Sequence, residues 1–204
     1  MLQVHTVEPR TLGLLNTIMA VPELEGFNLA GGTSLALQIG HRKSVDLDMF
    51  GNRPFEKGEI IELLADVGDC HTMHQTKNIL ILNIEGIKVD FVNYQYPLIR
   101  DVKMESGVRL LDLPDIAAMK LSAITGRGKK RDFIDIFFLL KEFPLRTLLE
   151  FYNQKYSDNS ELLVARSLTY FDDADGDEDL NLFIQVSWPD VKKRILTEVK
   201  KLYQ

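Results

Sequence analysis

Two aspartates stand at a spacing that suits metal-assisted phosphoryl transfer. Asp46 and Asp48 are two residues apart in the segment 44–50 (SVDLDMF), whose alternation of polar and apolar residues predicts a strand. Both carboxylates would leave the same face of that strand, where they repel each other unless a cation neutralises them. Oxygen ligands on a rigid strand suit magnesium, so we predict that this pair binds Mg²⁺.

A third aspartate lies in another predicted strand. Asp90 falls in the middle of the otherwise apolar run 87–94 (IKVDFVNY), where a charged residue is seldom found without a reason. If the two strands are neighbours, Asp90 completes a site of three carboxylates. Such a site can hold two metal ions about 4 Å apart, one activating the attacking hydroxyl and one stabilising the leaving pyrophosphate. We predict Asp90 as the general base.

A glycine pair precedes the aspartates. Gly31 and Gly32 allow close approach of a ligand and a positive φ, and they are followed by Thr33 and Ser34. A short helix predicted over 34–39 would point its free N–H groups at an anion. We predict that these four residues bind the phosphates of a nucleotide. We expect a glycine turn over 30–33 in front of that helix. The alternative for the whole set is a plain turn and three solvated aspartates.

These residues need a scaffold of α+β class. The first half mixes helical and strand periodicities, and Val45, Leu47 and Met49 are expected to face its core. The elements expected there are helices over 10–19, 34–39 and 57–67 and strands over 44–50, 78–84, 87–94 and 108–112. Helices are expected afterwards over 114–124, 130–141, 145–155, 160–170 and 189–202. We predict a domain over 1–111 and a helical region over 112–204 that packs on it and completes the active site.

Three charged residues of the helical half are candidates for the same site. Lys120 lies among apolar neighbours, so it either extends to solvent, which composition favours, or contacts triphosphate oxygens, which the nearby motifs favour. Asp132 and Asp135 share one face of the next helix. Asp132 would also favour the dipole of that helix from its first turn. Asp135 is expected to pair with Arg131 or Lys120.

Composition narrows the class of protein. The chain has 204 residues with a hydrophobic fraction of 45% and a net charge of -6, which argues against a protein coated in positive charge for non-specific nucleic-acid binding. Short basic patches at 41–43 and 127–131 still allow RNA. The apolar runs are too short to cross a membrane, and residues 1–10 hold no signal-peptide core, so a cytoplasmic location is expected.

Two further features are read as structural. Cys70 is the only cysteine, which excludes an internal disulfide and a cysteine zinc cluster. The acidic run 172–179 (DDADGDED) lacks the glycine and glutamate offsets of a calcium loop, so we expect a solvated loop between helices.

The segment 31–50 (GGTSLALQIGHRKSVDLDMF) resembles the signature of the AbiEii-type toxins, minimal nucleotidyltransferases of abortive-infection and type IV toxin–antitoxin systems. The matching positions are Gly31, Gly32, Thr33, Leu35, His41, Arg42, Ser44, Asp46 and Asp48. The stretch 115–140 resembles the lysine and aspartate motifs of the family at Lys120, Asp132 and Asp135. The resemblance covers residues 27–141.

This resemblance implies a polymerase β-like fold followed by helices. It implies transfer of a nucleoside monophosphate from an NTP to the 3′ end of tRNA or to a protein hydroxyl, by a toxin countered by a cognate antitoxin encoded nearby. Arg42 would then contact the nucleotide, or else fix the loop before the strand. The alternatives are a nucleotidyltransferase for a small molecule such as an aminoglycoside, a catalytically inactive nucleotide-binding interaction protein, and a purely structural domain.

Overall fold

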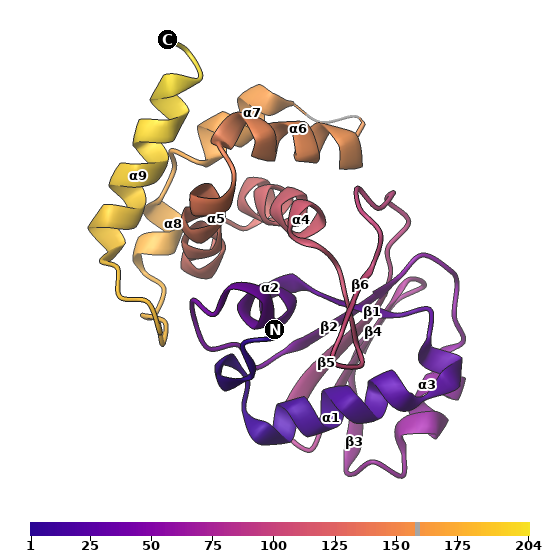
Figure 1. The fold of residues 1–204 in the computed structure, drawn as a ribbon. Helices are drawn as coiled ribbons and strands as arrows, with labels where there is room; N and C mark the ends of the chain where they lie inside the picture. Colours follow the sequence, from indigo (N-terminus) through magenta and orange to yellow (C-terminus); the bar gives the residue numbers. More distant parts are fainter. Residues whose placement is uncertain (158–159) are drawn as a thin grey trace. The chain divides into compact units, whose positions relative to one another are not determined.

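The computed structural model describes residues 1–157 and 160–204, which form two compact units. The first, the sheet unit, comprises residues 1–96 and 101–111. The second, the helical unit, comprises residues 97–100 and 112–204. Figure 1 shows the elements of each unit with their labels. Among the described residues, no helix is long and apolar enough to cross a membrane.

The sheet unit is built on a mixed seven-stranded sheet in the order β3-β4-β5-β2-β1-β7-β6. The strands are β1 (Asn28–Ala30), β2 (Leu47–Gly51), β3 (Cys70–Gln75), β4 (Ile79–Ile84), β5 (Ile87–Asn93), β6 (Lys103–Glu105) and β7 (Val108–Leu110). Its helices are α1 (Pro9–Ala20), α2 (Gly31–Ile39) and α3 (Lys57–Leu64), with 3₁₀ turns η1 (Val4–Thr6) and η2 (Pro22–Leu24). The α+β class predicted from the sequence is confirmed.

Alternation along the central strands separates a core face from a half-exposed face. Leu47, Met49, Val89 and Phe91 are fully buried on the core face of β2 and β5. They pack in one cluster with residues of α1 and α3, the helices that flank the sheet in Figure 1. Asp48 lies between two of these core residues in sequence, so it points to the opposite face.

The predicted strand over 44–50 is wrong at its start, because β2 begins at Leu47. Ser44 pairs instead with Val7, and its backbone N–H donates to the Thr6 carbonyl, so the N-terminal segment competes for these residues. Val45 is consequently 51% exposed rather than part of the core. The predicted hairpin between β4 and β5 is confirmed, with positive φ at Glu85 and Gly86.

The helical unit contains the helices expected from the sequence, with small differences at their ends. They are α4 (Leu113–Gly126), α5 (Lys130–Glu142), α6 (Leu145–Lys155), α7 (Glu161–Ser167), α8 (Asp172–Asp175) and α9 (Trp188–Lys201). Side chains cap several starts: the carboxylate of Asp112 accepts from the N–H of Leu113, and the hydroxyl of Ser187 accepts from that of Asp190.

The acidic run 172–179 is largely exposed, as its composition predicts, but it is not a loop throughout. It begins with the short helix α8, and some of its carboxylates have basic partners in the same unit. Asp175 accepts from Lys192 at 2.9 Å, and Asp177 accepts from Lys129 at 3.1 Å. Neighbouring cations offset the repulsion that would otherwise keep such a run unfolded.

Candidate active site

Asp48 and Asp90 are brought together by the pairing of β2 with β5. The two strands are parallel, and Asp48 is the register partner of Asp90. Neighbouring strands lie about 4.8 Å apart, so these side chains leave the same face side by side. The condition under which Asp90 can join Asp48, that their strands are neighbours, is therefore met. We call this half-exposed side of the sheet the carboxylate face.

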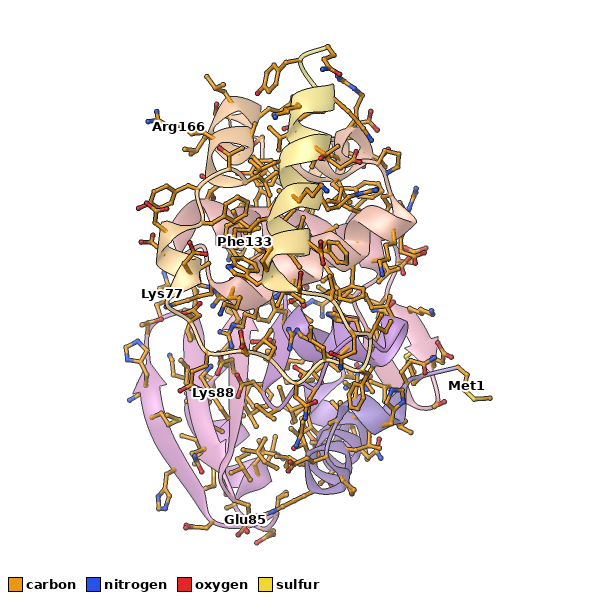
Figure 2. The ribbon with its side chains drawn as sticks, turned by 90° about the vertical axis from the view of Figure 1, so that its left-hand side faces the viewer. Met1, Lys77, Glu85, Lys88, Phe133 and Arg166 are labelled. Atoms are coloured by element: carbon orange, nitrogen blue, oxygen red, sulfur yellow. The ribbon has the colours of Figure 1, made fainter. Side chains whose placement is uncertain are left out.

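One oxygen of Asp90 is paired and the other is not. Oδ2 accepts from the ammonium of Lys88 at 2.5 Å, whereas Oδ1 is buried and has no hydrogen-bond partner among the described residues. A buried acceptor without a donor costs free energy, which a bound cation or hydroxyl would recover. Lys88, labelled in Figure 2, was missed in the sequence, although its spacing of two residues from Asp90 places both on one face.

Asp46 has a different setting from Asp48. It precedes β2 and is half-buried, and its backbone carbonyl accepts from the Thr33 hydroxyl. Within residues 1–157 and 160–204, no three His, Cys, Asp or Glu side chains are gathered as a metal site. The structure thus pairs Asp48 with Asp90 and does not gather the predicted cluster of three. Binding of Mg²⁺ stays a prediction, supported by the charge of this pair and by the Oδ1 atom of Asp90, which has no donor among the described residues.

The glycine pair is required by two close approaches. Gly31 has a φ of +63°, and a Cβ added there would lie 1.9 Å from Oδ2 of Asp48. A Cβ added to Gly32 would lie 2.5 Å from Nη2 of Arg42. The predicted positive φ is confirmed, but the predicted glycine turn is wrong, because α2 begins at Gly31 itself. The start of α2 therefore lies directly between a carboxylate and a guanidinium.

The hydroxyls of Thr33 and Ser34 are committed to the protein. Both residues are fully buried. The Thr33 hydroxyl lies 2.8 Å from that of Ser44 and donates to the Asp46 carbonyl, while Ser34 donates to the Leu111 carbonyl at 3.3 Å. These bonds fix α2 against the segment before β2. The backbone N–H groups of the first turn are then the donors that suit a phosphate, and their role stays a prediction.

Arg42 lies beside the same helix start. It is 5% exposed, and its Nη1 donates to the Lys43 carbonyl at 3.0 Å. The neighbouring His41 is fully buried. Both roles considered for Arg42, contact with a phosphate and support of the loop, are compatible with a guanidinium next to Gly32.

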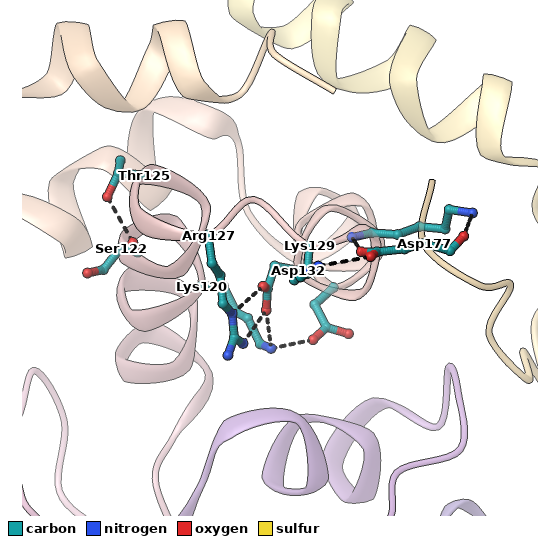
Figure 3. Close-up of polar contacts among 9 residues, drawn as sticks. Lys120, Ser122, Thr125, Arg127, Lys129, Asp132 and Asp177 are labelled. Atoms are coloured by element: carbon teal, nitrogen blue, oxygen red, sulfur yellow. Dashed lines mark hydrogen bonds and ion pairs between the residues drawn. The ribbon is translucent and has the colours of Figure 1, made fainter. Parts of the chain in front are cut away.

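In the helical unit, Lys120 joins two buried carboxylates. Its side chain is 7% exposed, and Nζ lies 3.0 Å from Oδ1 of Asp132 and 2.7 Å from Oδ2 of Asp135 (Figure 3). The expectation from composition that Lys120 extends to solvent is wrong, because α5 packs against α4 and covers it. The predicted pairing of Asp135 with Lys120 is confirmed.

Asp132 has a second cationic partner. Arg127 donates to it from Nε at 2.9 Å and from Nη2 at 3.1 Å. Complete burial opposes ionisation of this carboxyl, but the charge of Lys120 and the hydrogen bonds of Arg127 outweigh it and lower its pKa. Asp132 therefore does more than favour a helix dipole, since it balances two cations.

A second buried ion pair was missed in the sequence. Asp115 and Lys155 are both fully buried at the side chain, with Nζ 2.6 Å from Oδ1. Asp115 also accepts from the N–H groups of Ile99 and Arg100, and Lys155 donates to the Pro97 carbonyl at 2.8 Å. These bonds fix residues 97–100 to α4 and α6, and they explain why that short segment belongs to the helical unit.

The sequence as a whole matches a known family. The model of the nucleotidyl transferase AbiEii toxin family, of type IV toxin–antitoxin systems, matches residues 13–202. The chain belongs to this family. It is therefore a nucleotidyltransferase of the AbiEii toxin family, as the motif around the glycine pair and Asp48 implied. An uncharacterized protein of Aquifex aeolicus is 32% identical over 193 residues, which cover 92% of this chain and 93% of that protein.

Solved structures share the fold of this AbiEii-family chain. MenT4, a nucleotidyltransferase toxin of Mycobacterium tuberculosis, superposes with a TM-score of 0.61 at 11% identity, over 96% of this chain and 83% of that one. JHP933 of Helicobacter pylori superposes with a TM-score of 0.59 at 17% identity, over 97% of this chain and 93% of that one. The polymerase β-like nucleotidyltransferase architecture is thus confirmed.

Proposed function

We propose that this enzyme transfers a nucleoside monophosphate from an NTP to an acceptor hydroxyl with the help of Mg²⁺. The observation that carries the proposal is the placement of Asp48 between Asp90 and the start of α2. Asp48 is in register with Asp90 and faces Gly31 so closely that a methyl group would not fit. A carboxylate pair beside a helix N-terminus provides cation ligands next to phosphate donors.

Each residue then has a role. Asp48 and Asp90 would hold the cation, and Asp46 stays a predicted further ligand. The ion would lower the pKa of the acceptor hydroxyl and offset the charge of the triphosphate. The first-turn N–H groups of α2 bind phosphate oxygens. Asp90, through the Oδ1 atom that has no donor among the described residues, takes the proton from the attacking hydroxyl.

In the helical unit, the predicted contact of Lys120 with triphosphate oxygens remains a proposal of its own. Its two buried partners, Asp132 and Asp135, hold its ammonium in one orientation. Two carboxylates around a lysine leave it little freedom, so less entropy is lost when it meets a ligand.

The family also indicates biological partners. We propose that the chain acts as a toxin neutralised by a cognate antitoxin, as the type IV family description implies. We propose an RNA acceptor, the 3′ end of tRNA, with a protein hydroxyl as the rival outcome. MenT4, which shares the fold, is itself described as a nucleotidyltransferase toxin.

The test is transfer of label from each of the four α-³²P NTPs, with magnesium, to total bacterial RNA and protein. Asp48→Asn removes a carboxylate from the site, and Asp66→Asn makes the same change at an exposed position. We expect labelled RNA with the wild type and Asp66→Asn, and at least about a hundredfold less with Asp48→Asn. Full transfer by Asp48→Asn would refute the proposed site. Label absent from RNA and protein would favour a small-molecule acceptor.

A further inference from the structure

An aromatic ladder, Phe50, Tyr94 and Tyr96, lies on the carboxylate face. Phe50 is two residues beyond Asp48 on β2, so it shares its face. Tyr94 follows β5, and its N–H donates to the Gly51 carbonyl at 2.6 Å, which continues the strand pairing. The rings of Phe50 and Tyr94 are 5.0 Å apart at their centroids, and those of Tyr94 and Tyr96 are 4.9 Å apart.

The ladder continues an apolar row across the sheet. Phe50 is the register partner of Val92, and Val92 is the partner of Ile79. This row is half-exposed, and Tyr96 is 49% exposed at its end. It lies two residues, or about 7 Å, along the strands from the row that holds Asp48 and Asp90. Large rings at that distance from reacting groups provide a surface for a flat, apolar ligand.

Strand direction places this surface opposite the phosphate-binding end. β1 runs antiparallel to β2, with Ala30 beside Asp48, and the chain then enters α2 at Gly31. The start of α2 is therefore on the Asp46 side of Asp48, and Phe50 is on the other side. In an in-line displacement the attacking and leaving oxygens lie on opposite sides of the phosphorus. With pyrophosphate leaving at α2, the acceptor enters from the ladder.

We propose that the aromatic ladder is the surface against which the terminal base of an RNA acceptor stacks. This inference rests on the proposed function for the position of the triphosphate. Stacking on aromatic rings tolerates any base, because every base has a π-face. It also supplies affinity to a protein of net charge -6, which has little attraction for phosphates. A serine or tyrosine hydroxyl on a protein acceptor would not need such a row of rings.

The test is a binding cycle that requires no transfer. Fluorescein-labelled RNA with an unpaired 3′ end is titrated with wild type, Tyr96→Ala and Tyr96→Trp, and the same RNA with an abasic 3′-terminal nucleotide is titrated in parallel. Tyr203→Ala, at a site 66% exposed in the helical unit, is the control. We expect Tyr96→Ala to weaken binding of the intact RNA about tenfold and to leave that of the abasic RNA unchanged. Tyr96→Trp should retain affinity.

Steady-state kinetics then distinguish an effect on the RNA acceptor from an effect on the NTP. With Tyr96→Ala, the KM for RNA should rise about tenfold while the KM for NTP changes less than about twofold. A loss of NTP affinity instead would assign the ladder to the base of the incoming nucleotide and overturn the proposal. Equal loss for intact and abasic RNA, or labelling of protein that Tyr96→Ala leaves unaltered, would also overturn it. Because RNA binding is measured without turnover, the stacking proposal can be refuted independently of the transferase proposal.

Discussion

The two units hold acidic side chains in contrasting states of charge balance. In the helical unit, Asp115 and Asp132 are fully buried, and each has a lysine and further donors around its two oxygens. On the carboxylate face, Asp48 and Asp90 lie side by side and half-exposed, and one buried oxygen of Asp90 has no donor among the described residues. In the first arrangement the protein itself supplies the partners of each carboxylate, and in the second a carboxylate oxygen is left without one in the part of the chain that the structure describes.

This contrast distinguishes carboxylates that stabilise the fold from carboxylates that take part in the reaction. Removing a charge from water is costly, and a folded chain sustains it only when partners saturate the group. A site that must accept a cation or a proton during a reaction cannot be saturated in advance. The fully paired carboxylates of the helical unit are therefore expected to govern stability, and the carboxylate face, where Asp90 keeps an oxygen without a donor among the described residues, is expected to govern activity. Four substitutions test that division.

The largest effect is expected at Lys155. Lys155→Met leaves the fully buried carboxylate of Asp115 without its cation, which typically costs about 3–5 kcal/mol. We expect that loss in the free energy of unfolding from urea titration. The control, Lys193→Met, changes an exposed lysine of α9 and should alter stability by less than about 0.5 kcal/mol. Similar small effects for both variants would show that the buried pair contributes little.

The next effect is expected on activity, at Gly31. An alanine there is strained by the positive φ and displaces the Asp48 carboxylate, whose Oδ2 would lie 1.9 Å from the new Cβ. Misplacement of a reacting group by about 1 Å can cost roughly a hundredfold in rate, so we expect Gly31→Ala to lose about that much transferase activity.

Gly13→Ala is the matched control, because nothing lies within 4 Å of a Cβ at this position in α1. It should retain full activity and stabilise the helix by about 0.5–1 kcal/mol. If Gly31→Ala transfers nucleotide at the wild-type rate, then Asp48 does not act from the position seen in the structure.

The carboxylate face and the buried ion pair of Asp115 with Lys155 also differ in how far the sequence could predict them. The glycine pair and the aspartates carry local signals, a two-residue strand period and a residue type needed for positive φ, and their placement was predictable. The pairing of Asp115 with Lys155 joins residues 40 positions apart, and nothing local marks either one as buried. The helical spacing of apolar residues in α4 likewise could not show whether Lys120 reaches solvent or a carboxylate, because its partners belong to another helix.

Strands without an alternation of apolar and polar residues could not be predicted from the sequence either. β3 (Cys70–Gln75) is exposed along most of its length at one edge of the sheet, so its sequence, CHTMHQ, carries no burial pattern. The start of β2 was misplaced because its apparent alternation extended into Ser44, which pairs with the N-terminal segment instead. Local periodicity predicts elements well where one face is buried, and poorly where a tertiary partner decides.

A smaller effect on stability is expected from the pH dependence of Asp132. Its pKa is lowered in the folded chain, so the stability it contributes is present above the ordinary aspartate range near 4 and is lost as pH falls through the folded pKa. We expect Asp132→Asn to cost about 1–3 kcal/mol at pH 7 and to reduce the loss of stability on acidification. Urea titrations at pH 7 and pH 3 measure both. Asp173→Asn, at an exposed position, should keep the wild-type slope.

The smallest effect on folding is expected at Lys88, the cation beside Asp90. Its side chain is 37% exposed, and such pairs contribute less than about 1 kcal/mol, so Lys88→Gln should leave unfolding nearly unchanged. The ammonium and a divalent cation would compete for the same carboxylate. Removing a unit charge at this distance changes the interaction by about 1 kcal/mol, so calorimetry should show Mg²⁺ binding about fivefold tighter. Lys77→Gln, in the turn before β4, should bind Mg²⁺ as the wild type does. Equal affinity in both variants would mean that Asp90 is no metal ligand, and its Oδ1 atom would then serve the acceptor hydroxyl alone.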